Sequence, residues 1–338
     1  MCMDIDIVIP WVDGNDLKWQ QDKSKYENTI SGDKRIIRYR DWDNLQYWFR
    51  GVEKFLPWVR TIHFITYGHL PAWLNVENPK LHIVNHQDYI PLQYLPTFSA
   101  NPIEMNIHRI EGLSDHFIYS NDDMFFIREM SPEFFFKKGL PVDSSVENVQ
   151  FFKKGGIDNI IANDLAVLNE HFFKRTTLKK YFFKWLHLYY GKGVLKNIYL
   201  LPFPYFSGFD NPHLPQAFLK KTFEDLWNAE PEWMDETSSH KFRSKEDINQ
   251  WLARYWQLAS GNFIPGNINR GKFFSIGRDN IQIQEAITHQ KFKMICLSDD
   301  SVLLDFKKEK KFIRNCFEHI LPEESSFELQ RDRKTGDF

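Results

Sequence analysis

Four short apolar runs constrain the fold of this chain more than any other feature of its sequence. They cover residues 5–10 (IDIVIP), 61–66 (TIHFIT), 81–84 (LHIV) and 116–120 (HFIYS). Between the first two runs, residues 43–55 carry apolar side chains three and four positions apart, which predicts an amphipathic helix. Short apolar strands that alternate with helices favour an α/β fold built on a mainly parallel sheet.

The rest of the chain changes character after residue 130. Helical patterns dominate at residues 214–227 and 245–258, and a late apolar run at 292–297 predicts one more strand, before a basic helix at 307–320. We expect this strand to return to the sheet and complete its site. The expected parts are an α/β part, a mainly helical part and a returning strand with its helix, over residues 1–135, 136–290 and 291–338.

Acidic residues follow three of the predicted strands. They are Asp13, Asp16, Asp122, Asp123, Asp299 and Asp300. Ligands of parallel α/β sheets bind beyond the carboxyl ends of the strands. A diphosphate bound there needs a hard cation, Mg²⁺ or Mn²⁺, held by carboxylates. The pattern resembles a nucleotide-sugar-binding domain, and a solvated turn is the alternative for any single pair.

Charge and cysteine content exclude several classes of protein. The 43 Lys and Arg against 45 Asp and Glu give a formal net charge of −2, without the basic excess of a bulk nucleic-acid binder. The three cysteines are far apart and lack CxxC spacing, which excludes a disulfide framework and a cysteine zinc site. No apolar run reaches the roughly 18–20 residues that span a bilayer, and the N-terminus carries acids where a signal peptide carries basic residues. We expect a soluble cytoplasmic protein with no nucleic-acid partner.

Residues 171–193 are unusually basic and aromatic, with six basic residues and no acid. One interpretation is peripheral association with the inner face of the cell membrane, because basic and aromatic side chains suit an anionic interface. The other is a helix whose lysines face outward and whose aromatic side chains face the core. The aromatic residues concerned are Phe172, Phe173, Tyr181, Phe182 and Trp185.

The most specific pattern lies in residues 38–126. It reads RYRDWDNLQYWFRGVEKFLPWVRTIHFITYGHLPAWL, then VNHQDYI, then LPTFSANPIEMNIHRIEGLSDHFIYSNDDMFF. This run closely resembles the second conserved region of the Stealth family of hexose-1-phosphate transferases, which includes bacterial capsular polysaccharide phosphotransferases and the animal N-acetylglucosamine-1-phosphotransferase. The opening IDIVIPWVDGND is similar to the family's first region, residues 168–258 to the third, and KMICLSDD to the short fourth.

The resemblance implies a glycosyltransferase A-like nucleotide-sugar-binding sheet with a helical acceptor-side region. It also implies that hexose-1-phosphate or N-acetylhexosamine-1-phosphate passes from a UDP-sugar to a hydroxyl of a glycan or lipid-linked oligosaccharide. The product would be a phosphodiester in a capsular or exopolysaccharide, and UMP would leave. Attack on phosphorus requires positive charge around its oxygens and an activated hydroxyl. Two alternatives stay open: a conventional UDP-sugar glycosyltransferase that releases UDP, and a non-catalytic glycan-binding protein.

Four positions match catalytic motifs of the family. They are Asp123 in NDD, His213 in NPHLP, Arg243 in HKFR and Asp299 in LSD. Either Asp123 or His213 would act as general base. Arg243 would bind phosphate oxygens through its planar guanidinium. Because Ser298 stands where the family has Asn, Asp300 is an alternative to Asp299.

The resemblance also implies a metal site and a donor pocket. Asp122 and Asp123 would coordinate Mg²⁺ or Mn²⁺. We expect His108 and Glu111 on one face of a helix over residues 104–113, where Glu111 would orient His108. Gly14 would let the backbone approach the donor closely. The donor-binding candidates, for each of which a purely structural role is the alternative, are Trp11, Asp13, Gly14, Asp16, Arg38, Arg50, His86, Asp88, His108, Arg109 and Glu111.

Overall fold

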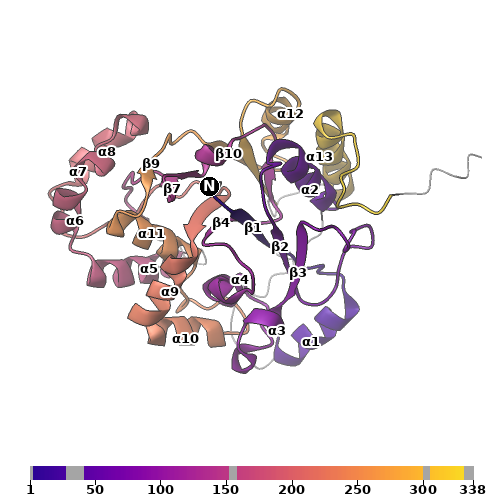
Figure 1. Ribbon diagram of the computed structural model, residues 1–338, viewed down its shortest axis with the longest axis horizontal. Coiled ribbons are helices and arrows are strands. Elements are labelled where there is room, and N and C mark those ends of the chain that lie inside the picture. The colour runs from indigo at the N-terminus through magenta and orange to yellow at the C-terminus, as the bar shows by residue number, and fades with distance from the viewer. Residues whose placement is uncertain (1–2, 28–41, 152–157, 300–304, 331–338) are drawn as a thin grey trace, which may run out of the picture.

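A computed structural model describes residues 3–27, 42–151, 158–299 and 305–330. Its central sheet has the order β3-β2-β1-β4-β8 (Figure 1). The first four strands are parallel, and they are β1 (Ile5–Pro10), β2 (Ile62–Thr66), β3 (Leu81–Asn85) and β4 (His116–Tyr119). All four predicted strands are therefore confirmed, and with them the α/β fold.

The fifth strand of this sheet comes from the middle of the chain. β8 (Gln216–Leu219) pairs antiparallel with β4 and leads directly into α9 (Lys220–Ala229). The prediction of one continuous helix over residues 214–227 is therefore wrong at its start. The reason is burial, since residues 216–218 are enclosed by the sheet and its covering helices. The segment before β8 is thereby fixed beside the end of β4.

A second, three-stranded sheet has the order β10-β11-β5. It consists of β10 (Gly271–Ser275), β11 (Met294–Ser298) and β5 (Met124–Phe126). The late strand exists as predicted but does not join the central sheet. Instead β11 pairs antiparallel with β5, with Cys296 opposite Met124. The late strand β11 thus lies beside β5, the strand that follows β4, in a second sheet.

Aromatic packing joins these two sheets. The predicted amphipathic helix is α2 (Leu45–Phe55), which buries the face that carries Trp48 and Phe49. Gly51 allows α2 to approach β5, because a Cβ there would lie 2.6 Å from the carbonyl oxygen of Phe126. The tail helix α13 (Phe306–Ile320) packs on the same core through Phe317, which contacts Tyr47 and Phe125.

Helices cover the other face of the central sheet. α9, α10 (Pro231–Ser239) and α11 (Gln250–Ser260) pack there around Phe117 and Phe218. Further out, at the left of Figure 1, lie helices from the middle of the chain. These are α5 (Asp158–His171), α6 (Lys174–Lys180), α7 (Phe182–Trp185) and α8 (Gly193–Leu200). The other α-helices and strands of the described chain are α1 (Leu17–Glu27), α3 (His86–Tyr89), α4 (Ala100–Met105), α12 (Asn280–Thr288), β6 (Phe136–Lys137), β7 (Leu140–Asp143) and β9 (Ile264–Pro265).

The expected helix over residues 104–113 is wrong. α4 ends at Met105, and Ile107–Arg109 form a single 3₁₀ turn. Asn106 causes the break, since its buried side chain donates to the carbonyl of Pro102 at 2.9 Å and so ends the helix. No helix in the described part of the chain is long and apolar enough to cross a membrane.

Candidate functional site

Asp123 lies between β4 and β5, where the parallel strand β4 ends. The backbone N–H of Leu297 on β11 donates to its carbonyl at 2.9 Å and fixes its position. Its carboxylate Oδ2 accepts a hydrogen bond from Cys296 Sγ at 3.4 Å. The other oxygen, Oδ1, is buried and has no hydrogen-bond partner among the described residues. The two oxygens therefore face different surroundings.

His213 reaches the same carboxylate from the segment before β8. Its Nε2 lies 3.8 Å from Asp123 Oδ2, and ligand atoms of His213, Asp123 and Cys296 all lie within 4.8 Å of one another. Its φ of 45° is in the left-handed region, which is uncommon for histidine and costs free energy. The ring also contacts Phe273 edge-on at 6.0 Å between centroids. The fold thus holds the imidazole of a residue with an unfavourable backbone conformation against an acid.

The surroundings of His213 change its protonation. Burial alone would lower the pKa of this imidazole, but the nearby carboxylate of Asp123, with a further contribution from the charge of Glu104, raises the pKa above its ordinary value. Arg243 acts in the opposite direction on the same ring. The neutral form of His213 is therefore a stronger base than an ordinary histidine.

A buried network holds the segment that carries His213. Arg254 on α11 binds both oxygens of Asp143 at 2.8 and 2.9 Å, and Asp143 also accepts from Gln216 at 2.8 Å. The same guanidinium donates to Asn211 Oδ1 at 2.9 Å, while Asn211 Nδ2 donates to the hydroxyl of Tyr255. Because Arg254 and Asp143 are buried, this network fixes the backbone two residues before His213.

Sequence reasoning missed Glu104, a buried acid beside the site. Its carboxylate accepts from the hydroxyl of Tyr119 at 2.8 Å and from the backbone N–H of Gln250 at 3.2 Å. Burial raises its pKa, and its charge acts on both His213 and Arg243. The available signal was its position between Ile103 and Met105, where an acid in an apolar helical segment needs a reason.

Arg243 belongs to a loop between α10 and α11 that Asp247 organises. The buried carboxylate of Asp247 accepts from the backbone N–H of Ser244 at 2.9 Å, from Asn101 Nδ2 at 2.6 Å and from His240 Nδ1 at 2.6 Å. These contacts place Arg243 within electrostatic range of both His213 and Glu104. Positions that are far apart in the sequence therefore meet in one site.

The acids beside Asp123 differ in exposure. Asp122 is exposed, although its charge still acts on Cys296. Asp299 is half-buried and lies at the same end of the second sheet, two residues beyond Leu297, whose N–H bonds to Asp123. Asp300 lies outside the described residues. The structure thus distinguishes the two acids of the NDD motif, because Asp123 is half-buried and contacts His213 and Cys296, whereas Asp122 is exposed.

The loop after β1 is organised by His69, which sequence reasoning also missed. His69 Nε2 accepts from the backbone N–H of Asp13 at 2.7 Å, and its Nδ1 lies 3.7 Å from Asp16 Oδ1. Trp11 stacks on Phe64 and meets the His69 ring edge-on. Burial lowers the pKa of His69, so a neutral ring joins the two sides of the loop.

Two acceptors in the same loop serve helix α1. Asp16 Oδ1 accepts from the backbone N–H of Trp19 at 2.7 Å, and the carbonyl of Gly14 accepts from Gln20 Nε2 at 2.7 Å. These contacts cap the first turn of α1. Asp16 and Gly14 therefore have local structural partners, and so does Asp13, whose Oδ1 accepts from the backbone N–H of Asn15 at 2.8 Å.

The two histidine candidates of the second region are neutral, and of these His86 is buried and His108 is half-buried. Burial lowers the pKa of His86 and of His108 to about 4. His86 is the first residue of α3, and Asp88 caps that helix by accepting from the backbone N–H of Asn85 at 2.7 Å. The expected pairing of Glu111 with His108 on one helix is wrong, because Glu111 is exposed beyond the 3₁₀ turn.

The remaining arginine candidates have other surroundings. Arg109 stacks its guanidinium on Trp227, 4.6 Å from the ring centroid. Arg50 binds both oxygens of Glu328 at 2.7 Å and the carbonyl of Leu321 at 3.0 Å, which ties the C-terminal segment to α2. Arg38 lies outside the described residues. Arg50 therefore acts as a structural clamp in this conformation.

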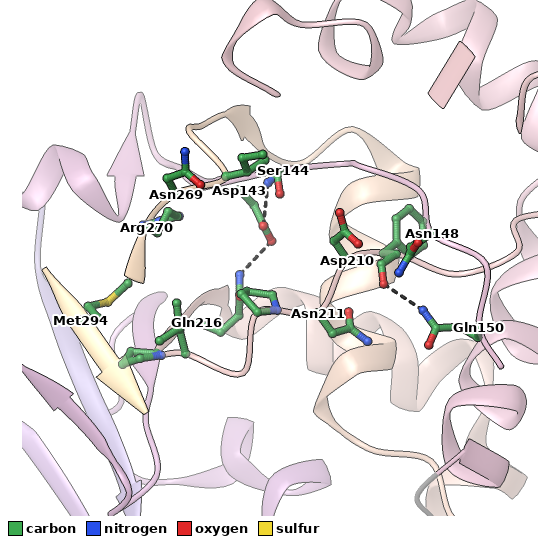
Figure 2. A pocket seen from close by; sticks show the side chains of 15 residues that line it. Asp143, Ser144, Asn148, Gln150, Asp210, Asn211, Gln216, Asn269, Arg270 and Met294 are labelled. Atoms are coloured by element: carbon green, nitrogen blue, oxygen red, sulfur yellow. Dashed lines mark hydrogen bonds between the residues drawn. The ribbon is translucent and has the colours of Figure 1, made fainter. Parts of the chain in front are cut away.

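A polar cavity of about 470 Å³ adjoins the segment that carries His213 (Figure 2). Pro212 and Leu214, the two neighbours of His213, form part of its wall. Its other lining side chains are mostly amides and carboxylates, and they include Asp143, Asn148, Gln150, Asp210, Asn211, Gln216, Asn269 and Arg270. Such a lining offers both hydrogen-bond donors and acceptors at one wall of the site.

Comparison with known proteins matches this chain to two family models. They are described as Stealth protein CR1, conserved region 1, over residues 3–31, and Stealth protein CR2, conserved region 2, over residues 38–143. These matches confirm the first two regions of the resemblance.

Curated relatives match the chain over nearly its whole length. The capsular polysaccharide phosphotransferase WcwK of Streptococcus pneumoniae is 41% identical over 96% of this chain and 98% of its own length. The exopolysaccharide phosphotransferase cps2G of Lactiplantibacillus plantarum is 38% identical over 96% of each chain. The receptor polysaccharide phosphotransferase WefC of Streptococcus gordonii is 37% identical over 96% of this chain and 99% of its own.

Proposed function

The chain belongs to the Stealth family of polysaccharide phosphotransferases, and we propose that it transfers hexose-1-phosphate or N-acetylhexosamine-1-phosphate from a UDP-sugar to a glycan hydroxyl. The acceptor oxygen attacks the sugar-side phosphorus, the bond from that phosphorus to the bridging oxygen breaks, and UMP leaves. The acceptor's proton passes to a base in the site. The product is a phosphodiester in a capsular or exopolysaccharide.

The meeting of Asp123 and His213 carries this proposal. The two residues come from distant parts of the chain, yet their side chains lie 3.8 Å apart at the carboxyl end of the parallel strands. The left-handed backbone of His213 shows that the fold keeps this contact at a cost. Strain of this kind is concentrated at functional sites.

The two oxygens of Asp123 suit two roles. Oδ2 faces His213 and would stabilise the imidazolium that forms when His213 takes the acceptor's proton. Oδ1 is buried without a hydrogen-bond partner among the described residues, which suits a ligand of a hard cation. His213 is therefore the base in this proposal, and Asp123 both supports it and binds metal.

A divalent cation at Asp123 is part of this proposal. Mg²⁺ or Mn²⁺ would be held by Asp123 Oδ1, with Asp122 and Asp299 as the neighbouring acids. When bound, the cation supplies positive charge against the diphosphate of the donor. Cys296 is an unsuitable ligand for such an ion, because Mg²⁺ and Mn²⁺ prefer oxygen ligands to the soft sulfur of a thiol.

Cationic and polar groups of this chain complete the site. Arg243 lies within electrostatic range of His213 and would bind the oxygens of the transferred phosphoryl group. The cavity beside Pro212 and Leu214 would bind a sugar unit of the acceptor, because its amides and carboxylates match the hydroxyls of a saccharide. The acceptor hydroxyl would then approach from the side of the His213 segment.

Nucleotide-product analysis tests the proposal. Purified protein is incubated with a panel of UDP-sugars, Mg²⁺ and a capsule-derived acceptor, beside Asp123→Asn and the control Asp115→Asn, which changes an exposed acid away from the cluster. We expect UMP and a phosphorus-containing glycan from the wild type and the control, and neither from Asp123→Asn. UDP as the only nucleotide product would establish the conventional glycosyltransferase instead. Glycan binding without any nucleotide product would favour the non-catalytic alternative.

A further inference from the structure

We propose that the outer side of α6, α7 and α8 docks on the surface of an anionic membrane. This aromatic–basic face is defined by ten exposed apolar side chains. They are Phe173, Phe182, Phe183, Leu188, Tyr189, Leu195, Ile198, Tyr199, Phe203 and Tyr205. The described part of the chain has twenty large apolar side chains in this exposed class, so half of them fall within this one segment. Concentrated apolar exposure of this kind marks an interaction surface.

The exposed side chains are not the core side of these helices. Leu188 is 89% exposed and Phe183 is 84% exposed, whereas Trp185 and Tyr190, between and beside them, are fully buried. Trp185 stacks on Phe206 at 5.4 Å between centroids. The expectation that the aromatic residues of this segment form its core is therefore confirmed for Trp185 and wrong for Phe173 and Phe182, which are exposed. The segment thus buries Trp185 and Tyr190 and exposes the apolar side chains that precede and follow them in the chain.

The charge of the residues around this face indicates which kind of surface it binds. Residues 171–209 contain seven Lys or Arg and no Asp or Glu, although the chain as a whole carries −2. Two of these lysines point inward, since Lys174 donates to the carbonyl of Leu200 at 2.7 Å and Lys184 to those of Gly261 and Phe263. The basic side chains that remain exposed are Arg175, Lys179, Lys180, Lys192 and Lys196.

An anionic lipid surface complements this combination best. Aromatic side chains bury their rings at the headgroup level, and lysines attract acidic lipids. A second copy of the chain would bring two basic faces together, which like-charge repulsion opposes. Figure 1 shows α6, α7 and α8 at the outer edge of the molecule, where a flat surface can reach them.

The face also borders the cavity beside the His213 segment. Lys196 on α8 binds Asp210 Oδ1 at 3.0 Å and Asn148 Oδ1 at 3.4 Å, and both of these residues line that cavity. If the proposed function holds, an acceptor glycan on a lipid carrier would meet the cavity from the membrane side. Docking itself rests on the exposed face and not on catalysis.

Vesicle sedimentation tests the docking with the full chain. Vesicles of phosphatidylcholine alone are compared with vesicles that also contain phosphatidylglycerol, at low and high salt. We expect binding to the mixed vesicles that weakens with salt. The double variant Phe183→Ser/Leu188→Ser should bind at least tenfold more weakly, and Lys179→Glu/Lys180→Glu should lose the preference for phosphatidylglycerol by about fivefold or more per lysine.

A matched control tests whether the loss of exposed apolar side chains anywhere on the surface weakens vesicle binding. Leu17→Ser/Leu92→Ser removes two side chains of similar exposure, 73% and 77%, from elsewhere on the surface, and should leave vesicle binding unchanged. Equal binding of the wild type to both kinds of vesicle, or no loss in the face variants, would overturn the proposal. So would a dimer in sedimentation that the same face variants dissociate, because a second copy would then cover the face. Turnover with a water-soluble acceptor is measured separately, and its failure with intact vesicle binding would count against the function alone.

Discussion

At the scale of single residues, Asp123 and Asp122 are adjacent in sequence but unequal in the structure. Asp123 contacts His213 and Cys296 and keeps one buried oxygen without a hydrogen-bond partner in the described chain. Asp122 is exposed. The NDD motif alone does not distinguish Asp122 from Asp123 as the functional acid. The pairing of β11 with β5 shows which of the two side chains points into the site.

Replacement of these two acids should therefore have unequal effects. We expect Asp123→Asn to lower kcat by about 10²–10⁴-fold, because it removes the charge beside His213 and the oxygen ligand together. Asp122→Asn should lower kcat less. Steady-state release of UMP with both purified variants measures the difference. A larger loss in Asp122→Asn than in Asp123→Asn would contradict the placement of the two side chains.

Cys296 gives a second prediction at this scale. Burial, together with the charges of Asp123 and Asp122, raises the pKa of its thiol, and burial raises that of Cys316 to about 11. The thiolate is the form that reacts with alkylating reagents. In native protein at pH 8, iodoacetamide should therefore leave both thiols unmodified, while denatured protein should react at both. Peptide mapping by mass spectrometry distinguishes the sites, and rapid native labelling of Cys296 would refute its burial.

At the scale of elements, two loops carry the cationic residues of the site, and a buried acid organises each. Asp143 binds Arg254, which fixes Asn211 and the segment of His213. Asp247 binds the backbone of Ser244 and the ring of His240 on either side of Arg243. The hydrogen bonds of Asp143 and Asp247 thus position both loops, although neither acid takes part in the proposed transfer reaction.

The Arg254–Asp143 pair should be costly to break. Arg254→Met leaves a buried carboxylate without its partner, so the free energy of unfolding should fall by about 3–5 kcal/mol. The matched control Lys221→Met breaks the exposed Lys221–Asp225 pair and should cost less than about 1 kcal/mol. Urea denaturation followed by fluorescence measures both values. Equal losses in the two variants would show that the buried network does not stabilise the fold.

The His240–Asp247 pair should make stability depend on pH. The hydrogen bond that His240 Nδ1 donates to Asp247 raises the pKa of His240, against the effect of burial. The stabilisation by the protonated ring is therefore complete below about 6.5, the unfolded-state pKa, and is lost as the pH rises through the folded-state value. The difference in Tm between wild type and His240→Gln should be largest at pH 6 and shrink by pH 8.5. A difference that grows with pH would contradict the assignment.

At the scale of the whole molecule, local patterns in the sequence predicted the elements better than their partners. Four strands, α2 and α13 are predictable because each carries its own apolar period. The second sheet is not, since nothing in residues 124–126 indicates pairing with residues 294–296. Residues 216–219 of β8 were predicted as part of a helix, because the partner strand β4 lies far away in the sequence.

The residues of the site were likewise predictable where a local motif marks them and not where long-range contacts define them. Asp123, His213, Arg243 and Asp299 were accessible through motif resemblance. The sequence marks Glu104 only as an acid within an apolar helical segment. The contacts of Glu104 and His69 with residues distant in the sequence are not revealed by one sequence. Arg50 shows the converse, because its motif suggested a ligand but its guanidinium is bound to Glu328 near the other end of the chain.

A label on the β-phosphorus of the UDP-sugar distinguishes transfer of the sugar together with its phosphorus from transfer of the sugar alone. The labelled donor is incubated with the enzyme, Mg²⁺ and a glycan acceptor, and the products are separated into polymer and nucleotide. We predict that the label enters the polymer in a phosphatase-resistant phosphodiester and that the UMP released is unlabelled. Recovery of the label in UDP, with none in the polymer, would contradict the account.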